Sequence, residues 1–374
     1  MTERESAAIS LLLSKLESHR GFNLNMIIGL DGFVDEIIHV VDKRQDFNNF
    51  TRIAFIEELG ARIVKAAGLS TNIELVVQQT KLGGNGPIFS NALIEYGIHL
   101  TYIGALGVPD IHPVFKPLAQ KAAAVYSLCN PGQTDALEFV DGKLMLGKHS
   151  SLTAITWELF KKILGGVDRI AEMIKPCQLF GMENWTMIPR MSEVWEGLVE
   201  EVFPLLPDKP EKSIAFFDLA DPEKRTKADI LHAMGLISRF EDKFNTILGL
   251  NEKELYEIAE VLGIREYNLQ SATVAVYNKL GIYCLVVHPT KQAVCVINDE
   301  FYQVEGPYCP NPILTTGAGD NFNAGFCLAQ ALGFDAQSSL ALGVSTSGYY
   351  VRNAKSPSFD DILSFLRDWQ HGRI

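Results

Sequence analysis

The chain has 374 residues, of which 47% are hydrophobic, so it can bury a large core and is not a disordered protein. Its 33 Lys and Arg residues against 45 Asp and Glu residues give a net charge of −12, and no basic run stands out. This balance argues against a nucleic-acid or anionic-membrane partner and favours a small-molecule partner.

The six cysteines are scattered, without Cys-x-x-Cys pairs or histidines at metal-ligand spacing. They are typical of reduced thiols in the core of a cytoplasmic protein. Near the N-terminus, Ile9, Leu12 and Leu16 recur at helical spacing, which predicts an amphipathic helix rather than a signal peptide. No apolar run is long enough to span a bilayer, so we expect no membrane partner.

The first buried strand is expected at residues 25–30, and it opens into a loop that contains Asp31 and Asp35. Both carboxylates follow a strand end, where a ligand can reach them, although an ordinary Asp- and Gly-rich turn explains the same residues. Residues 36–42 then indicate a second strand. Apolar residues at helical spacing predict a helix at about 50–67.

A strand expected at residues 73–77 is followed by Gly83-Gly84-Asn85-Gly86, which by itself predicts a turn. Further along, residues 135–140 and 143–147 alternate in polarity and are joined by Asp141-Gly142. That pair between two alternating runs predicts a β-hairpin.

From about residue 150 the pattern alternates helices with short apolar strands, which predicts a doubly wound parallel sheet. The strands expected at 178–181 and 213–218 lead into Glu183-Asn184 and Asp218, at the sheet edge where such folds bind ligands. Because no linker, repeat or low-complexity stretch interrupts the chain, we expect residues 1–374 to form a single domain.

The most informative run lies at residues 312–326 and includes Gly317-Ala318-Gly319-Asp320. The apolar spacing after it predicts a helix that begins near Asp320 and ends at Gly333. The first N–H groups of a helix have no intrahelical partner and the helix dipole is positive there, so this turn suits an anion. Asp320 is itself an anion and is suited to accept a proton from an attacking hydroxyl, unless it is only a helix N-cap.

In this order the motifs resemble those of the ribokinase-like (PfkB) carbohydrate kinases. Residues 314–326 resemble the family's second signature, Asp-Thr-x-Gly-Ala-Gly-Asp-x-Phe-x-Ala-Gly-Phe, with Leu314 in place of the leading Asp. Residues 83–85 match its first glycine motif, in which Ile88 replaces a second Asn. Residues 251–254 resemble its Asn-x-x-Glu motif, whereas residues 288–293 replace the usual Thr-x-Gly-x-x-Gly loop.

The resemblance implies an α/β fold: a ribokinase-like, doubly wound, mostly parallel sheet with helices on both faces and a small β-sheet lid. The lid segments would be about 36–49, 73–82 and 124–150. It also implies an enzyme that uses ATP and Mg²⁺ to phosphorylate a hydroxyl of a sugar or sugar-like molecule. A homodimer is compatible with it, and so is a cytoplasmic location.

The resemblance also implies the roles of individual residues. Asp320 would be the general base, and Gly317, Ala318 and Gly319 would form an anion hole for the transferred phosphoryl group. Asp35, with Asp31 as its rival, would bind the sugar together with Gly84 and Asn85. The residues implied for the nucleotide are Asn251, Glu254, Lys291, Thr316, Gly343 and Ser347, and Glu254 would also hold Mg²⁺ through water.

Other functions are weighed against this one. The glycine run lacks the Gly-Lys-Ser/Thr end of a P-loop and lies too late in the chain for a dinucleotide-binding motif. A weakly active sugar- or nucleotide-binding regulator on the same fold is favoured by Leu314, Ile88 and the altered loop at 288–293. The intact Gly-Ala-Gly-Asp run favours the enzyme, since a binding protein does not need the base. Many members of the family hold K⁺ through the Asp that Leu314 replaces, so we expect no K⁺ requirement.

Overall fold

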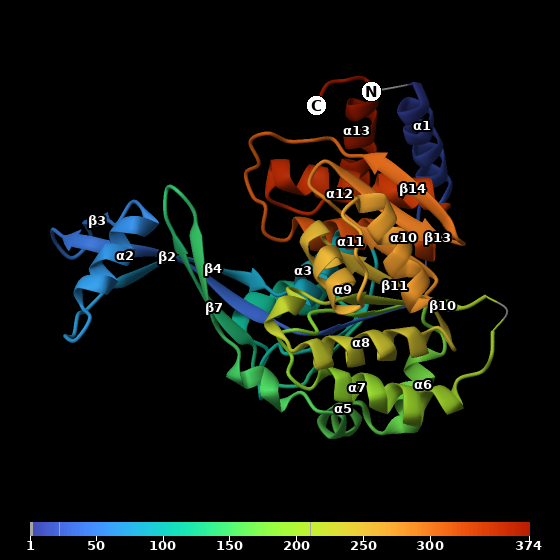
Figure 1. Ribbon diagram of the computed structural model, residues 1–374, viewed down its shortest axis with the longest axis horizontal. Coiled ribbons are helices and arrows are strands. Elements are labelled where there is room, and N and C mark those ends of the chain that lie inside the picture. Colours follow the sequence, from blue (N-terminus) through green and yellow to red (C-terminus); the bar gives the residue numbers. More distant parts are fainter. Residues whose placement is uncertain (1–2, 22, 210) are drawn as a thin grey trace.

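The computed structural model describes residues 3–21, 23–209 and 211–374, and it consists of a body and a projecting lid (Figure 1). The body is built on a nine-stranded sheet in the order β14-β13-β12-β11-β10-β9-β1-β5-β6. The seven strands from β12 to β6 are parallel, and β13 and β14 are added antiparallel at one edge. Its strands are β1 (Met26–Leu30), β5 (Thr101–Gly104), β6 (Ala124–Ser127), β9 (Leu179–Met182), β10 (Ser213–Asp218), β11 (Phe244–Leu250), β12 (Cys284–Val287), β13 (Gln292–Ile297) and β14 (Glu300–Glu305).

Helices cover both faces of this sheet, and each face has its own large apolar cluster. One face packs against α5 (Trp157–Leu164), α6 (Val167–Ile174), α7 (Met191–Gly197), α8 (Lys227–Phe240), α9 (Glu252–Val261) and α10 (Leu269–Leu280). The other face packs against α1 (Glu3–Ser18), α3 (Asn85–Glu95), α4 (Lys116–Lys121), α11 (Ala318–Ala331), α12 (Ala336–Asn353) and α13 (Phe359–Gln370). The parallel strands inside the sheet are buried on both sides, which explains their continuous apolar sequences, whereas the edge strand β6 is half-buried.

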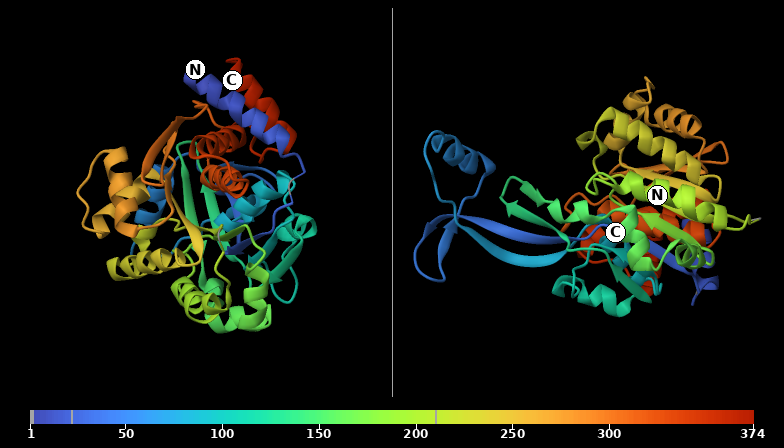
Figure 2. Two further views of the ribbon diagram at one scale, coloured as in Figure 1. Left: turned by 90° about the vertical axis from the view of Figure 1, so that its right-hand side faces the viewer. Right: turned by 90° about the horizontal axis from the view of Figure 1, so that it is seen from below.

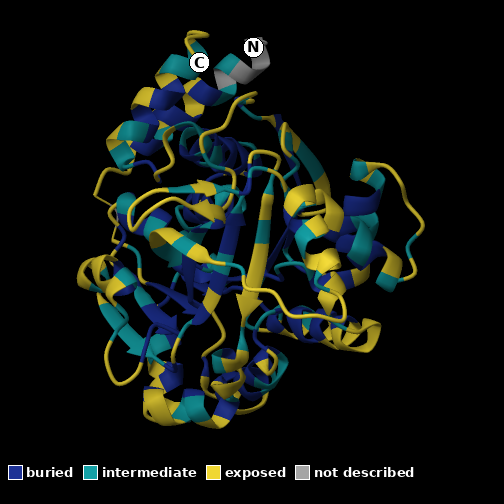
Figure 3. Cartoon of the chain, turned by 90° about the vertical axis from the view of Figure 1, so that its left-hand side faces the viewer, coloured by how far each residue is buried: buried dark blue, intermediate teal, exposed yellow. Residues whose placement is uncertain are grey.

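The lid is a second, five-stranded sheet that extends away from the body (Figures 1 and 2). Its central strand, β2 (Phe33–Arg44), pairs with β3 (Phe50–Arg52), β4 (Leu75–Gly83) and β7 (Gly132–Glu138), and β8 (Lys143–Lys148) completes the sheet beside β7. Helix α2 (Ile56–Lys65) packs on the outer part of the lid, and a small apolar cluster lies between the two. Most of β4 is exposed, in contrast to the buried strands of the body (Figure 3).

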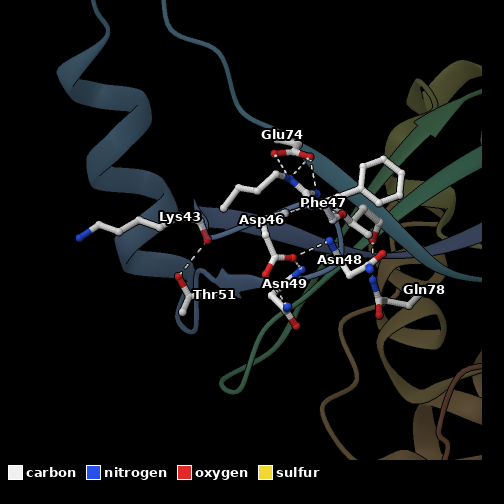
Figure 4. A network of polar contacts seen from close by, with 10 residues as sticks. Lys43, Asp46, Phe47, Asn48, Asn49, Thr51, Glu74 and Gln78 are labelled. Atoms are coloured by element: carbon white, nitrogen blue, oxygen red, sulfur yellow. Dashed lines mark hydrogen bonds and ion pairs between the residues drawn. The ribbon is translucent and has the colours of Figure 1, made fainter.

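The turn at the tip of the lid is held by polar contacts (Figure 4). The Asp46 carboxylate accepts hydrogen bonds from the backbone N–H groups of Asn48 and Asn49, at 2.8 and 2.9 Å. The Arg44 guanidinium donates to both carboxylate oxygens of Glu74 and to the Phe47 carbonyl. These contacts fix the turn between β2 and β3, although the residues there are exposed.

The predicted fold class is confirmed, and several predicted elements are found with adjusted limits. The first helix buries Ile9, Leu12 and Leu16, as expected. The helix expected at 50–67 is shorter, because residues 50–52 pair with β2 before α2 begins. The third lid segment begins later than residue 124, since residues 124–127 pair with β5 in the large sheet. Among the described residues, no helix has both the length and the apolar composition to cross a bilayer.

Candidate active site

The carboxyl ends of the parallel strands meet along one edge of the large sheet and bring acidic residues together. Asp31 follows β1, Glu183 follows β9 and Asp218 ends β10. These three side chains are at most 7% exposed. In open α/β sheets this edge is where ligands bind, so the topology places a candidate site here.

Helix α11 points its N-terminus at this edge, and its start has the geometry of an anion-binding site. Gly317 is the N-cap residue with a φ of 90°, a conformation that favours glycine. Among the described residues, the backbone N–H groups of Gly317 and Gly319 have no acceptor. Two donors at a positive helix end are therefore available to an anion such as a phosphoryl group.

Asp320 occupies the third position of α11 and is 7% exposed. Burial, together with the charge of Asp31, raises the pKa of Asp320 well above its ordinary value, whereas a hydrogen bond from the Asn85 side chain lowers it. The Asn85 amide also lies 3.4 Å from a carboxylate oxygen of Asp218. Asn85 thus bridges two acids that would otherwise repel each other.

Asp31 and Asp35 have different surroundings, which separates the two rivals for the sugar-binding role. Asp31 is fully buried, and its carboxylate accepts from the N–H groups of Asn85 and Gly86, each at 2.9 Å. It also accepts from the Asn184 amide at 2.7 Å. Burial raises the pKa of Asp31 to about 6. Asp31 therefore supports the start of α3, and Asp35 is the carboxylate that faces open space.

That space is a cavity of about 590 Å³ between the lid and the start of α11, here called the lid cavity. It unites predicted residues from distant parts of the chain. Those that line it are Asp35, Gly84, Asn85, Asn251, Glu254, Thr316, Gly317 and Asp320.

Asn251 and Glu254 form a capping box at the start of α9. One Glu254 carboxylate oxygen accepts from the Asn251 N–H at 2.9 Å, and the other accepts from the Asp221 N–H at 3.0 Å. Burial raises the pKa of Glu254, although these hydrogen bonds oppose the shift. Glu254 is therefore both a structural cap and a wall of the lid cavity.

A second cavity, of about 280 Å³, lies on the other side of the α11 N-terminus, here called the β12 cavity. Ala318, Gly319 and Ser347 line it, as does His288 directly after β12. The His288 ring is packed on Phe322, with 4.9 Å between ring centroids, and burial lowers its pKa to about 4. The imidazole is therefore neutral at physiological pH.

Two of the residues predicted to bind the nucleotide line neither cavity. The Lys291 ammonium lies 5.1 Å from the centre of the Tyr308 ring, and it is Tyr308 that lines the β12 cavity. Gly343 is buried against the Phe322 ring, where a Cβ would come within 2.7 Å of the ring. Its role is close helix packing, which residue spacing alone does not distinguish from ligand contact.

Other residues of the lid cavity were not predicted. Thr134 and His149 come from the lid, and Lys224 comes from the segment after β10. Ala220 and Asp221, just before Lys224, both have positive φ angles, of 57° and 59°. Two successive non-glycine residues in this conformation are a strained feature typical of functional sites. Only the Asp and Pro residues of this segment give any sequence signal of a tight turn.

Comparison with known proteins agrees with this geometry. The sequence model of the family described as prokaryotic ketohexokinase matches residues 18–369. The chain belongs to the prokaryotic ketohexokinase family. Members of this family are carbohydrate kinases, phosphotransferases with an alcohol group as acceptor, and the chain is such an enzyme.

A ketohexokinase from Haloferax volcanii is 28% identical over 342 residues, which cover 91% of this chain and 90% of the relative. Ribokinase from Thermotoga maritima has a TM-score of 0.60 at 15% identity, over 92% of this chain and 100% of that chain. Arabidopsis thaliana ribokinase, solved with ribose and ATP, has a TM-score of 0.60 at 16% identity, over 92% of this chain and 98% of that chain. At these identities the solved structures establish the ribokinase fold.

Proposed function

We propose that the chain transfers the γ-phosphoryl group of ATP to a hydroxyl of a neutral ketohexose such as fructose. The observation that carries the proposal is the position of Asp320. It faces the lid cavity from the first turn of α11, next to two backbone N–H groups that have no acceptor among the described residues. A base and an anion hole side by side suit phosphoryl transfer to an alcohol.

The chemical step follows from this arrangement. The acceptor hydroxyl oxygen attacks the γ-phosphorus, and the bond from that phosphorus to the β–γ bridging oxygen breaks, so that ADP leaves. The hydroxyl proton passes to the Asp320 carboxylate. The N–H groups of Gly317 and Gly319 stabilise charge on the transferred group, while Ala318 forms the turn between them. Because burial raises the pKa of Asp320, the ionised Asp320 carboxylate is a stronger base than an exposed aspartate.

The lining of the lid cavity supports a neutral acceptor. Among the described residues that line it, the acids are Asp35, Asp221, Glu254 and Asp320, and Lys224 is the one Lys or Arg. The Lys224 ammonium is already paired with Asp221 at 3.0 Å. A sugar acid or sugar phosphate would be repelled by this excess of negative charge, whereas the hydroxyls of a neutral sugar can donate hydrogen bonds to it. Asp35, Asn85 and the Gly84 backbone are the proposed sugar contacts.

The β12 cavity is the proposed site for the nucleoside part of ATP, since Ala318 and Gly319 link it to the anion hole. Thr316, which lines the lid cavity, and Ser347, which lines the β12 cavity, would contact the nucleotide from the two sides of the α11 N-terminus. Among the described residues, no group of three or more acidic, His or Cys side chains is arranged to hold a metal ion. Mg²⁺ fits this site nevertheless, because it commonly keeps several waters and binds through phosphates and one carboxylate. Glu254 is the proposed carboxylate, acting through water, and Mg²⁺ would neutralise phosphate charge.

The test is a comparison of acceptors in an assay of ADP release with ATP and Mg²⁺. The acceptors are fructose, fructose 6-phosphate, gluconate and adenosine, so that charge and ring type vary separately. We expect fructose to give the highest kcat/KM and the two anionic acceptors to give little turnover. Equal or better turnover with an anionic acceptor would contradict the charge argument, and no turnover with any neutral sugar would contradict the proposed activity.

A further inference from the structure

The loop before α11 is held from behind by a tyrosine. The Tyr350 hydroxyl, on α12, donates a hydrogen bond to the carbonyl oxygen of Thr316 at 2.9 Å. A Cβ added to Gly317 would lie 2.8 Å from that hydroxyl and 3.2 Å from the Ile88 side chain on α3. The Thr316–Gly317 peptide is therefore confined in a slot between two helices.

Tyr350 does not reach the space where an acceptor would bind. It lines a separate hollow of about 730 Å³, together with Leu314 and Thr316, and it is not part of the lid cavity lining. Gly317, by contrast, lines the lid cavity. The Tyr350 hydroxyl therefore has no direct contact with an acceptor in the lid cavity, and its hydrogen bond acts on the loop.

The geometry of a peptide bond specifies what that effect is. In a planar trans peptide, the carbonyl of one residue and the N–H of the next point in opposite directions. Because Tyr350 binds the Thr316 carbonyl, the Gly317 N–H is directed away from Tyr350. The following carbonyl, that of Gly317, is fixed by the backbone N–H and the side-chain amide of Asn321, at 3.1 and 2.8 Å. The peptide planes on both sides of Gly317 are thus held.

We propose that Tyr350 is a positioning residue whose hydroxyl aims the Gly317 N–H at the phosphoryl group during transfer. The inference rests on the proposed function, in which this N–H belongs to the anion hole. A glycine in the left-handed conformation is otherwise easily reoriented, since it lacks a Cβ. Without the Tyr350 hydrogen bond, the Thr316–Gly317 peptide would be free to rotate, and the donor would spend less time in its productive direction.

The protonation state of Tyr350 suits this task. Burial, and secondarily the charge of Asp320, raise the pKa of Tyr350 to about 12. The hydroxyl therefore keeps its proton at neutral and moderately alkaline pH.

The experiment compares Tyr350→Phe with Tyr349→Phe, a matched control on the same helix. Tyr349 packs edge-on against Phe365, with 5.7 Å between ring centroids, and lines neither the lid cavity nor the β12 cavity. We expect Tyr350→Phe to lower kcat about 10- to 100-fold, somewhat less than the loss of a whole oxyanion donor. The Kd values for fructose and for ADP, measured by calorimetry, should change less than threefold, and Tyr349→Phe should match the parent in all of these.

A second measurement separates this inference from the proposed function. ADP with aluminium fluoride imitates the phosphoryl group in transfer, so its affinity relative to ADP alone reports on the anion hole without turnover. If the parent chain binds this mixture no more tightly than ADP, the anion hole itself is wrong. If the parent shows the gain and folded Tyr350→Phe keeps it, with unchanged kcat, the role of Tyr350 is refuted. Loss of the gain in Tyr350→Phe alone supports it.

Discussion

Substitutions of Asp31 and Asp35 should separate a structural carboxylate from a sugar-binding one. The Asp31 carboxylate accepts three hydrogen bonds, from the N–H groups of Asn85 and Gly86 and from the Asn184 amide. Its removal in Asp31→Ala would leave buried donors without an acceptor. We expect a loss of about 3–5 kcal/mol in the free energy of unfolding, comparable with breaking a buried charged pair.

Asp31→Asn refines that expectation. The amide keeps the shape of the carboxylate but offers one acceptor oxygen in place of two. If that oxygen serves the donors of Asn85 and Asn184, the new NH₂ group faces the Gly86 N–H. One unsatisfied buried donor costs about 1–3 kcal/mol. The loss is partly offset because a buried carboxylate, whose pKa is raised to about 6, no longer has to be ionised at neutral pH.

Asp35→Ala should behave in the opposite way. Asp35 is 6% exposed and lines the lid cavity, where Thr134 is its hydrogen-bond partner. Losing one hydrogen bond costs about 1 kcal/mol of unfolding free energy. Each sugar hydroxyl that loses a charged acceptor costs about 1.5–3 kcal/mol of binding, which is about 10- to 100-fold in Kd. Urea denaturation and fructose calorimetry measure both effects. Unchanged fructose affinity in Asp35→Ala, together with lost affinity in a stable Asp31→Asn, would refute the reasoning.

Three further predictions follow from the same site. Asp320→Asn should keep the fold and bind ATP and fructose, but lower kcat by about 10²–10⁴-fold, and turnover within a few-fold of the parent would contradict its role as base. Glu183 is fully buried with neither carboxylate oxygen hydrogen-bonded among the described residues, and burial raises its pKa well above the ordinary value. A raised pKa in the folded state means that stability is lost as pH rises through that pKa. In urea denaturation, Glu183→Gln should therefore gain stability relative to the parent as the pH rises above the ordinary pKa of a glutamate, by up to about 1.4 kcal/mol per pH unit. The same pH dependence of stability in both proteins would contradict this. Turnover in Na⁺ or choline buffer should match that in K⁺ buffer within a few-fold, because Leu314 offers no side-chain oxygen to a cation. Tenfold activation by K⁺ would contradict this.

Local signals in the sequence were sufficient for the elements that depend on local chemistry. Gly317 and Gly319 indicated the start of α11, and Asp141-Gly142 indicated the hairpin of β7 and β8, because such turns are specified by a few neighbouring residues. The order of strands and motifs was sufficient to predict the fold class. The resemblance to the ribokinase-like motifs named candidate residues in distant segments, and eight of them line the lid cavity.

What the sequence did not determine depends on the direction of side chains in three dimensions. Asp31 and Asp35 are four residues apart and have the same chemistry, yet one faces α3 and the other faces the cavity. Lys291 and Gly343 are next in sequence to residues that line the β12 cavity. The Lys291 ammonium nevertheless lies over the Tyr308 ring, and Gly343 packs against the Phe322 ring. His149 and Lys224 belong to no recognisable motif, since the lid and the segment after β10 meet only in the folded protein.

The site has two surfaces of different electrostatic character, the acidic strand ends and the start of α11. In the proposed reaction, the sugar would lie on the first and the phosphoryl group on the second. The acids at the ends of β1, β9 and β10 lie beneath the lid cavity, and burial raises the pKa of each because it disfavours the charged carboxylate. An anion near any of these acids that is ionised would be repelled. At the start of α11, by contrast, backbone donors that have no acceptor among the described residues and the helix dipole favour negative charge. In the proposed reaction the transferred phosphoryl group would therefore lie at the start of α11, and a hydroxyl of a neutral sugar would approach it from the acidic side. Asp320 stands between these two surfaces, so in the proposed reaction it would receive the proton at the point where the new O–P bond forms.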